Sequence, residues 1–461
     1  MASIIEPRVL KGFRDFLPPQ EIARRSLIEK IEGSFRSYGF VPIDTPALEY
    51  AEILLGKGGG DTEKQIYRFK DKGDRDVALR FDLTVPFARF IAQYKQELGL
   101  PFRRYHIAKV WRGENTQRGR YREFTQCDVD IVGSESAAAD FEILLVMRNT
   151  FKALGLEVSI HLNHRGLFNK FLTRIGAAEK SVEILRTVDK LAKIGEEETR
   201  RLLAEITGED GAARILQFIN CRGTYGEVLK TMTELSGGPS PESGRLEILR
   251  SYMADTGTGD SFVLDPAITR GLDYYTGIVY ETFLNDDPSI GSVCSGGRYD
   301  NLAGLYSKDP VSGVGASIGL DRLAAALEDL GKPGERPSYT VLAVAAGGEE
   351  EAGRRQALAE QFRARGIPCE VLLETGGRGG GASADGKTDS KADGKALVRQ
   401  FIQAEKKGIP WVLMPPQAPG GTLTLRDIGA RQNREGLSLQ DVIEIVGGGA
   451  KGQMRRPYDL P

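Results

Sequence analysis

Two stretches of alternating aromatic, β-branched and polar residues most constrain how this chain can fold. They read RRYHIAKVWRGEN over 103–115 and RGRYREFTQCDVDIVG over 118–133. Such alternation is typical of half-buried strands, and very few residues separate the two stretches. The pattern therefore predicts a long antiparallel hairpin with its turn near Gly119.

The second strand of this hairpin carries an unusual polar face. Because alternate residues of a strand share one side, six residues are expected to point the same way. They are Arg120, Arg122, Phe124, Gln126, Asp128 and Asp130. This mixture suits a pocket in which a guanidinium meets phosphate, while carboxylates or amides meet an ammonium or imidazole. A solvated ladder of cross-strand ion pairs is the alternative interpretation.

The remaining pattern divides the chain into several parts. At 461 residues it is too long for one ordinary domain. Residues 165–260 have helical periodicity, whereas 339–446 alternate strands and helices as a small α/β domain does, after a Pro/Gly linker at 331–338. We expect a strand-like closing region for the first half, ending in a helix at 315–330.

Composition excludes several classes of protein. A formal charge of -2 argues against a protein that coats nucleic acid non-specifically, although local basic surfaces remain compatible with it. There is no apolar run of membrane-helix length and no secretory signal pattern. The four cysteines (Cys127, Cys221, Cys294 and Cys369) form no CxxC pair, so a reducing cytoplasm is expected. The three histidines lack the spacing of a structural zinc site, and no metal site is predicted.

Four short clusters could carry chemistry. The stretch RGLDYYTG, residues 270–277, places a cation, two phenols, a carboxylate and a hydroxyl beside permissive glycines. LRFDLTVP (79–86), SGGRYDNL (295–302) and GVGASIGLDR (313–322) each have a bland explanation alone, as a turn or as tight packing. GKGGGD (56–61) lacks the spacing of a P-loop.

Taken together, these clusters resemble the histidyl-tRNA synthetase family. VPIDTPALEY, VWRGENTQRGRYREFTQCD and GVGASIGLDRL are similar to motifs 1, 2 and 3 of class II synthetases, in that order. RGLDYYTG and GGRYDNL resemble the two peptides that distinguish the histidine enzymes. The segment KKGIPWVLM is similar to part of the family's anticodon-binding domain. One departure is Cys294 and Ser295, where the family pattern has more glycine, which is expected to affect a loop.

The resemblance implies an architecture. It implies an α+β catalytic domain over 1–335 with a mainly antiparallel sheet and a helical insertion at 165–260. An α/β anticodon-binding domain would follow at 336–450, containing a mobile loop at 375–395, with a tail at 451–461.

The resemblance also implies roles for individual residues. Arg270 and Arg112 would be catalytic, beside the α-phosphate of ATP. The histidine pocket would comprise Asp82, Leu83, Thr84, Gln126, Asp130, Tyr274 and Tyr275. The ATP site would comprise Arg112, Glu114, Arg120 and Arg322.

The implied activity is histidine–tRNA ligation. A homodimer would bind ATP, with Mg²⁺, and L-histidine, and would charge tRNA-His in the cytoplasm. The alternative is a non-catalytic regulatory subunit of ATP phosphoribosyltransferase, a relative that loses reactive residues and generally lacks the anticodon domain. A class II enzyme for another amino acid does not account for RGLDYYTG.

Overall fold

The computed structural model describes residues 4–56, 60–269, 275–300, 304, 306, 311–331, 337–373, 390–416 and 421–453. The chain divides into two compact units. Met1–Asp15 and Leu27–Lys332 form the larger unit, and Phe16–Ser26 and Pro333–Pro461 form the smaller one. Arg270 and Tyr274, which the sequence predicts in the site, lie outside the described residues.

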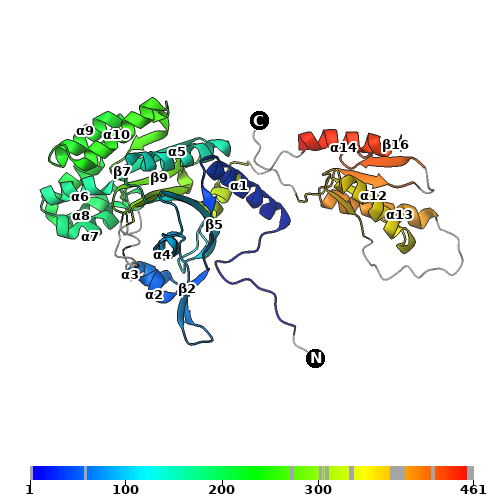
Figure 1. Cartoon of the computed structure of the whole chain (residues 1–461), viewed down its shortest axis with the longest axis horizontal. Coiled ribbons are helices and arrows are strands. Elements are labelled where there is room, and N and C mark those ends of the chain that lie inside the picture. Colours follow the sequence, from blue (N-terminus) through cyan, green and yellow to red (C-terminus); the bar gives the residue numbers. More distant parts are fainter. Residues whose placement is uncertain are drawn as a thin grey trace. The chain divides into compact units, whose positions relative to one another are not determined.

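The larger unit is built on an eight-stranded sheet with the order β1-β5-β6-β11-β10-β9-β7-β8. Figure 1 shows part of this sheet, with β5, β7 and β9 labelled. Its strands are β1 Val41–Pro42, β5 Phe102–Trp111, β6 Glu123–Val132, β7 Val158–His164, β8 Phe262–Leu264, β9 Ile278–Leu284, β10 Cys294–Tyr299 and β11 Gly313–Gly319. The two outermost pairs, β1 with β5 and β7 with β8, are parallel, and the five inner pairs are antiparallel. The mainly antiparallel sheet is therefore confirmed.

The predicted hairpin forms the centre of this sheet. Strands β5 and β6 pair without interruption from Phe102 opposite Val132 to Trp111 opposite Glu123. The turn contains Gly119, whose φ of +67° lies in the left-handed region that glycine adopts readily. The antiparallel hairpin with its turn near Gly119 is therefore confirmed.

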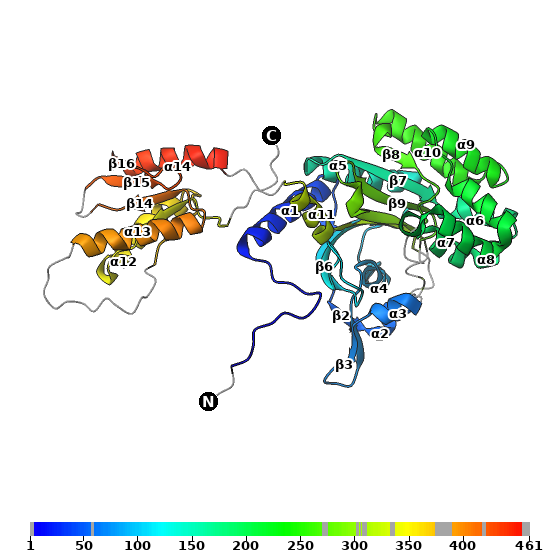
Figure 2. The ribbon, with the colours of Figure 1, turned by 180° about the vertical axis from the view of Figure 1, so that it is seen from behind.

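Helices cover both faces of the sheet. In Figures 1 and 2, α4 Thr84–Tyr94 and α5 Ala137–Ala153 lie on opposite sides of it. The helix α5 begins directly after Ser136, whose side chain accepts a hydrogen bond from the backbone N–H of Ala138. Two further helices of the unit are α2 Ala51–Leu55 and α3 Gly60–Gln65, and the helix α1 Pro18–Ser37 contributes its residues from Leu27 onward. A small antiparallel sheet has the order β2-β4-β3, with β2 Leu48–Tyr50, β3 Arg68–Lys70 and β4 Asp76–Leu79.

The segment between β7 and β8 is helical in the described residues, as predicted. It consists of α6 Arg165–Arg174, α7 Ser181–Val188, α8 Leu191–Ile219, α9 Tyr225–Leu235 and α10 Pro241–Asp255. The helical stretch α8 is interrupted at Gly195 and Gly208, both with φ near +80°. Figure 1 shows these helices gathered beside β7.

The prediction of a helix over 315–330 is wrong in its first third. Residues 313–319 form β11, which pairs with β6 on one side and β10 on the other. Only α11 Leu320–Asp329 is helical. The small residues GVGASIG let two neighbouring strands approach closely, and this packing decides the local structure where intrinsic helix propensity is weak.

The smaller unit is an α/β fold with the sheet order β13-β12-β14-β15-β16. Its elements are β12 Leu342–Val344, α12 Ala352–Arg363, β13 Cys369–Val371, α13 Ser390–Lys406, β14 Trp411–Met414, β15 Leu423–Asp427, β16 Gln432–Leu437 and α14 Leu439–Gln453. The sequence did not predict β16, because the first five of its six residues, QNREG, are polar or glycine and all five are exposed.

Two predicted segments of this unit need correction. The helix α13 begins at Ser390, so the loop predicted over 375–395 does not extend to 395. Residues 374–389 lie outside the described part of the chain. The helix α14 continues to Gln453, which places residues 451–453 of the predicted tail in a helix.

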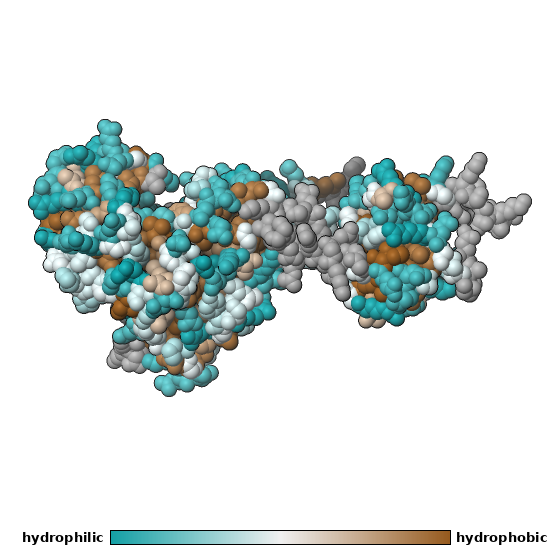
Figure 3. All heavy atoms as spheres, turned by 90° about the horizontal axis from the view of Figure 1, so that it is seen from above, coloured by the Kyte–Doolittle hydropathy of each residue, from teal (hydrophilic) through white to brown (hydrophobic). Residues whose placement is uncertain are grey.

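Apolar surface is dispersed. On the face shown in Figure 3, hydrophobic residues form separate patches among hydrophilic ones. None of the described helices is long and apolar enough to cross a membrane.

Candidate active site

A cavity of about 400 Å³ lies against β6, β10 and β11, and we call it the strand cavity. It brings together nine of the twelve predicted site residues: Asp82, Thr84, Arg112, Glu114, Arg120, Gln126, Asp130, Tyr275 and Arg322. Leu83, which lies between Asp82 and Thr84 in the sequence, is fully buried and does not line the cavity. Segments from four distant parts of the sequence thus meet at one place.

One end of the strand cavity is acidic and buried. Gln126, Asp128 and Asp130 project from β6 into it, at the alternate positions that the strand pattern predicted. Room for Asp130 comes from the opposite strand, because a Cβ at Gly315 would lie only 1.9 Å from the Asp130 Oδ1 atom. The Asp130 carboxylate can therefore occupy this position only because residue 315 in β11 is glycine.

A buried arginine balances the acids from behind. Arg104 on β5 has no exposed surface, and its Nη2 atom lies 2.7 Å from Asp130 Oδ2 and 4.0 Å from Asp128 Oδ2. Burial still dominates: it raises the pKa of Asp128 to about 7 and the pKa of Asp82 to about 6, against the opposing charge of Arg104. A further positive charge in the cavity would therefore stabilise the ionised forms of these carboxyls.

Several buried acceptors at this end have no hydrogen-bond donor among the described residues. They are Asp82 Oδ2, Gln126 Oε1 and Asp128 Oδ1. The other atoms of these groups are engaged: Asp82 Oδ1 accepts from the Val85 N–H at 3.0 Å, and Gln126 Nε2 donates to Ser317 Oγ at 2.7 Å. Buried polar atoms without donors are costly, so this set is suited to a ligand that supplies N–H groups and positive charge.

Two tyrosines form a wall beside the acids. The Tyr299 hydroxyl donates a hydrogen bond to Asp130 Oδ1. Tyr275 lies over Gly297, where a Cβ would come within 2.8 Å of its ring. The sequence analysis assigned no role to Tyr299 and placed Asp128 only on the polar face. The signal for both was present, in SGGRYDNL and in the strand alternation.

The other end of the strand cavity is rich in arginine. Arg112 Nε donates to the Phe81 carbonyl at 2.8 Å, and Arg322 Nη1 donates to the Ser292 carbonyl at 2.5 Å. Glu114 and Arg120 lie on the connecting segment of the hairpin, where Arg120 Nη1 is 4.0 Å from Glu114 Oε2. Such guanidinium groups suit phosphate oxygens.

The N-terminal segment supports this end, which the sequence analysis did not predict. Arg14 Nη2 lies 2.6 Å from Asp321 Oδ1, and Asp321 Oδ2 accepts the Thr125 N–H at 2.7 Å. The Arg14 guanidinium also lies 3.8 Å from the ring centre of Tyr121, which lines the cavity. No motif links residues so far apart in the sequence.

One member of the predicted polar face is misplaced. Arg122 Nε donates to the Glu114 carbonyl, and its backbone N–H donates to the Gly12 carbonyl. The reason is that β6 begins only at Glu123, after a turn closed by the bridge between Gln117 and Arg120. Strand alternation does not extend through that turn.

The departure at Cys294 and Ser295 lies in β10 and not in a loop. Gly296 is the position that needs glycine there, since a Cβ would lie 2.2 Å from the Gly315 carbonyl oxygen. Cys294 is buried, and Ser295 is exposed at the cavity.

The two histidines of HLNH have structural partners. His161 Nδ1 lies 2.9 Å from Asp265 Oδ2, and His164 Nδ1 accepts from the Gly166 N–H at the start of α6. Across the described ranges, no three His, Cys, Asp or Glu side chains are grouped to hold a metal ion.

Known proteins resemble this chain over nearly its whole length. The profile of histidyl-tRNA synthetases matches residues 12–323. The histidine–tRNA ligase of Treponema denticola is 51% identical over 420 residues, which cover 90% of each chain. That of Treponema pallidum (strain Nichols) is 46% identical over 444 residues, covering 94% of this chain and 96% of its relative. The crystal structure of histidyl-tRNA synthetase from Nostoc sp. PCC 7120 has a TM-score of 0.81 at 29% identity, covering 97% of this chain and 100% of that one.

The profile match and these identities agree with the motifs and with the geometry of the strand cavity. The chain belongs to the histidyl-tRNA synthetase family.

Proposed function

We propose that the strand cavity carries out the two steps of a histidine–tRNA ligase. In the first, L-histidine and ATP form histidyl-adenylate and pyrophosphate. In the second, histidine moves to a ribose hydroxyl at the 3′ end of tRNA-His. The observation that carries this proposal is a single cavity with two different ends. One end has buried carboxylates with acceptor atoms that lack a hydrogen-bond donor among the described residues, and the other end has arginines.

Histidine would occupy the acidic end. Its ammonium suits the carboxylates of Asp82 and Asp130, with Thr84 and Gln126 completing the set. Tyr274 and Tyr275 are assigned to the imidazole. A pocket that hydrogen-bonds its ligand on all sides can reject analogues by about 10⁴–10⁵, because the wrong ligand leaves buried polar groups unpaired.

ATP would occupy the arginine end. Arg112 is assigned to the α-phosphate and Arg322 to the outer phosphates, with Glu114 and Arg120 completing the site. Arg270 is assigned to a position beside the α-phosphate. Arginine suits this role because its planar fork binds phosphate oxygens in a bidentate manner.

The first step needs no general base, because the histidine carboxylate is already ionised at neutral pH. One carboxylate oxygen forms a bond to the α-phosphorus, and the bond from that phosphorus to the departing pyrophosphate breaks. The chain contributes alignment and positive charge where negative charge develops.

The residues present also fit magnesium bound together with ATP. Glu114 and Glu281 line the strand cavity with the arginines, and Mg²⁺ is usually held by one or two carboxylates plus substrate phosphates. When bound, the ion would neutralise phosphate charge. Its presence is part of the proposal.

Assembly and location complete the proposal. Val41, Leu48 and Tyr50 of the motif 1 region are at least 39% exposed, and β1 lies at the edge of the large sheet. Apolar residues at a sheet edge are suited to contact with a second copy of the chain. We assign a homodimer working in the cytoplasm, with the smaller unit reading the anticodon of tRNA-His.

Histidine-dependent exchange of labelled pyrophosphate into ATP tests the activity. The purified chain with Mg²⁺ is expected to catalyse exchange with histidine and not with the other amino acids. A clean absence of exchange would favour the regulatory subunit of ATP phosphoribosyltransferase. The arginines Arg112 and Arg322, both at the strand cavity, favour the ligase.

A further inference from the structure

Arg298 lies directly behind the wall of the histidine end. It precedes Tyr299 on β10, and successive strand residues point to opposite faces. Tyr299 therefore reaches Asp130 in the strand cavity, whereas Arg298 reaches α5 on the other side of the sheet. The Arg298 side chain is only 4% exposed.

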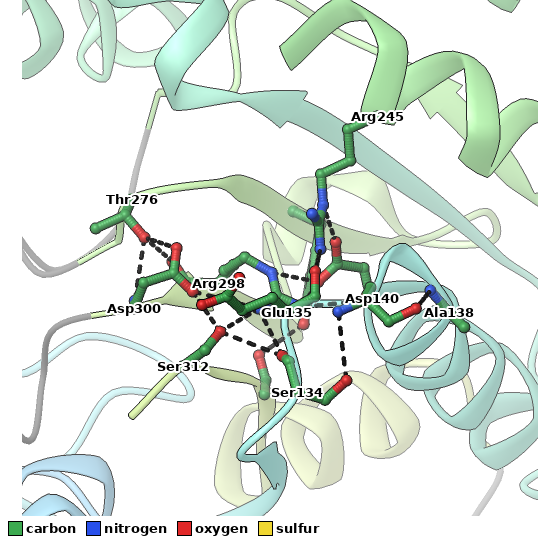
Figure 4. Close-up of polar contacts among 12 residues, drawn as sticks. Ser134, Glu135, Ala138, Asp140, Arg245, Thr276, Arg298, Asp300 and Ser312 are labelled. Atoms are coloured by element: carbon green, nitrogen blue, oxygen red, sulfur yellow. Dashed lines mark hydrogen bonds and ion pairs between the residues drawn. The ribbon is translucent and has the colours of Figure 1, made fainter. Parts of the chain in front are cut away.

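Asp140 of α5 joins Arg298 to the helical segment. Arg298 Nε donates to Asp140 Oδ1 at 2.7 Å, and Arg245 Nε of α10 donates to Asp140 Oδ2 at 2.5 Å. Figure 4 shows Arg245 extending from its helix onto Asp140, with Arg298 on the other side of that carboxylate. Arg245 Nη2 also donates to the Glu135 carbonyl at 2.9 Å.

The same arginine also holds the backbone next to Tyr275. The Arg298 carbonyl accepts the Thr276 N–H at 2.8 Å, and Thr276 Oγ1 donates to Asp300 Oδ2 at 2.7 Å. Arg298 Nη1 donates to Ser312 Oγ at 2.6 Å (Figure 4). Both tyrosines of the wall are thus adjacent in sequence to residues of this network.

We propose that Arg245 is a positioning residue for histidine binding, acting through Asp140 and Arg298 on the tyrosine wall of the strand cavity. This rests on the proposed function, since it assigns histidine to that end. Arg245 does not line the cavity itself. It acts on the position of the tyrosines through two ion pairs, Arg245 with Asp140 and Asp140 with Arg298.

The charges explain why this contact matters. Asp140 has no exposed side-chain surface, and burial raises its pKa while Arg298 and Arg245 oppose that shift. Without Arg245, Asp140 retains only Arg298 as an ion-pair partner in the network, so the carboxylate that accepts from Arg298 is held from one side alone. A buried network with a missing member loses its single well-defined geometry. The tyrosine wall loosens as a result, which weakens histidine binding and leaves the ATP end unchanged.

Arg245→Met and Arg245→Lys test this in the full-length chain. Calorimetry measures the Kd for histidine, which needs no turnover, and pyrophosphate exchange gives KM for histidine and for ATP. Arg245→Met is expected to raise the Kd and KM for histidine about three- to tenfold, which lies within the roughly 2- to 30-fold effects of residues that couple to a site from a distance. KM for ATP stays within about twofold, since the ATP end lies outside the network. Arg245→Lys, which keeps the charge, lies between wild type and Arg245→Met.

Arg250→Met is the matched control. Arg250 lies on the same helix and pairs at the surface with Glu247, with 52% of its side chain exposed. An unchanged histidine Kd in Arg245→Met, an equal rise in KM for ATP, or an equal effect of Arg250→Met would overturn the inference. A wild-type chain that binds histidine without exchange activity would refute the ligase proposal alone.

Discussion

The acidic end of the strand cavity, to which we assign histidine (the histidine end), is made of buried acids on paired strands. The arginine end, to which we assign ATP (the nucleotide end), is made of arginines at the end of a hairpin and the start of a helix. Asp128 and Asp130 are each 3% exposed, but Glu114 and Arg120 are 26% and 27% exposed. The first group is held by Arg104, Tyr299 and close strand contacts. At the nucleotide end, Arg112 and Arg322 each donate a hydrogen bond to a backbone carbonyl.

This difference separates two tasks. Selecting a small amino acid depends on buried groups that cannot relax around the wrong ligand. Stabilising a reacting phosphate depends on positive charge at the correct distance. We therefore expect substitutions at the histidine end to change affinity for histidine, and substitutions at the nucleotide end to change the rate of the chemical step.

Arg112→Ala is expected to have the largest effect. Removing one preorganised donor at a developing charge lowers rates by about 10²- to 10³-fold. We expect that loss in kcat for pyrophosphate exchange, with the calorimetric Kd for histidine nearly unchanged. The control is Arg103→Ala in the same hairpin, where the arginine pairs with Glu142 near the surface. A comparable loss of histidine affinity in Arg112→Ala would erase the distinction between the two ends.

Gly315→Ala is expected to damage the histidine end. The new Cβ would meet Asp130 Oδ1 at 1.9 Å and the Val129 carbonyl at 2.8 Å, so Asp130 must move by about an ångström. Displacement of that size lowers kcat/KM for histidine by about 10²-fold, and overpacking costs about 1–3 kcal/mol of stability. Exchange kinetics and thermal unfolding measure the two effects separately.

Gly226→Ala is the control for that substitution. Gly226 lies in α9, where an added Cβ would meet no side chain within 4 Å, and alanine favours helix. Wild-type histidine kinetics in a folded Gly315→Ala protein would show that the acidic end tolerates displacement and is not preformed.

The parts of this architecture that follow from local pattern were predictable. The hairpin with its turn near Gly119 and the polar face of β6 each follow from the pattern of neighbouring residues. What the pattern could not supply is partnership between distant segments. Nothing near Arg14 indicates Asp321, and nothing near Arg104 indicates that it lies behind Asp128 and Asp130. The strand β11 was missed for the same reason, since its glycines make sense only beside Asp130 and Tyr299.

The histidine end should also respond to pH, because its acids have raised pKa values. Burial, opposed by Arg104 and assisted by the charges of Asp130 and Asp82, gives Asp128 a pKa of about 7 against an ordinary value of 3.8. Between about pH 4 and 7, this carboxyl therefore holds a proton in the folded chain without ligand but is ionised in the unfolded chain. Its contribution to the free energy of unfolding thus falls as pH rises from about 4 to 7.

Histidine binding has the opposite dependence, because its ammonium favours the ionised carboxylate. Between pH 8 and 6.5 the ionised fraction of a group with a pKa near 7 falls about fourfold, so loss of the Asp128 charge should raise the histidine Kd by up to about fourfold. Asp128→Asn removes this titration while leaving Asp82, whose pKa is about 6, and the imidazole of the substrate. Calorimetry at several pH values should therefore give a flatter profile for Asp128→Asn than for wild type over this range. Parallel profiles would mean that Asp128 is already ionised without ligand, and that the surrounding strands and Arg104 stabilise its charge before histidine arrives.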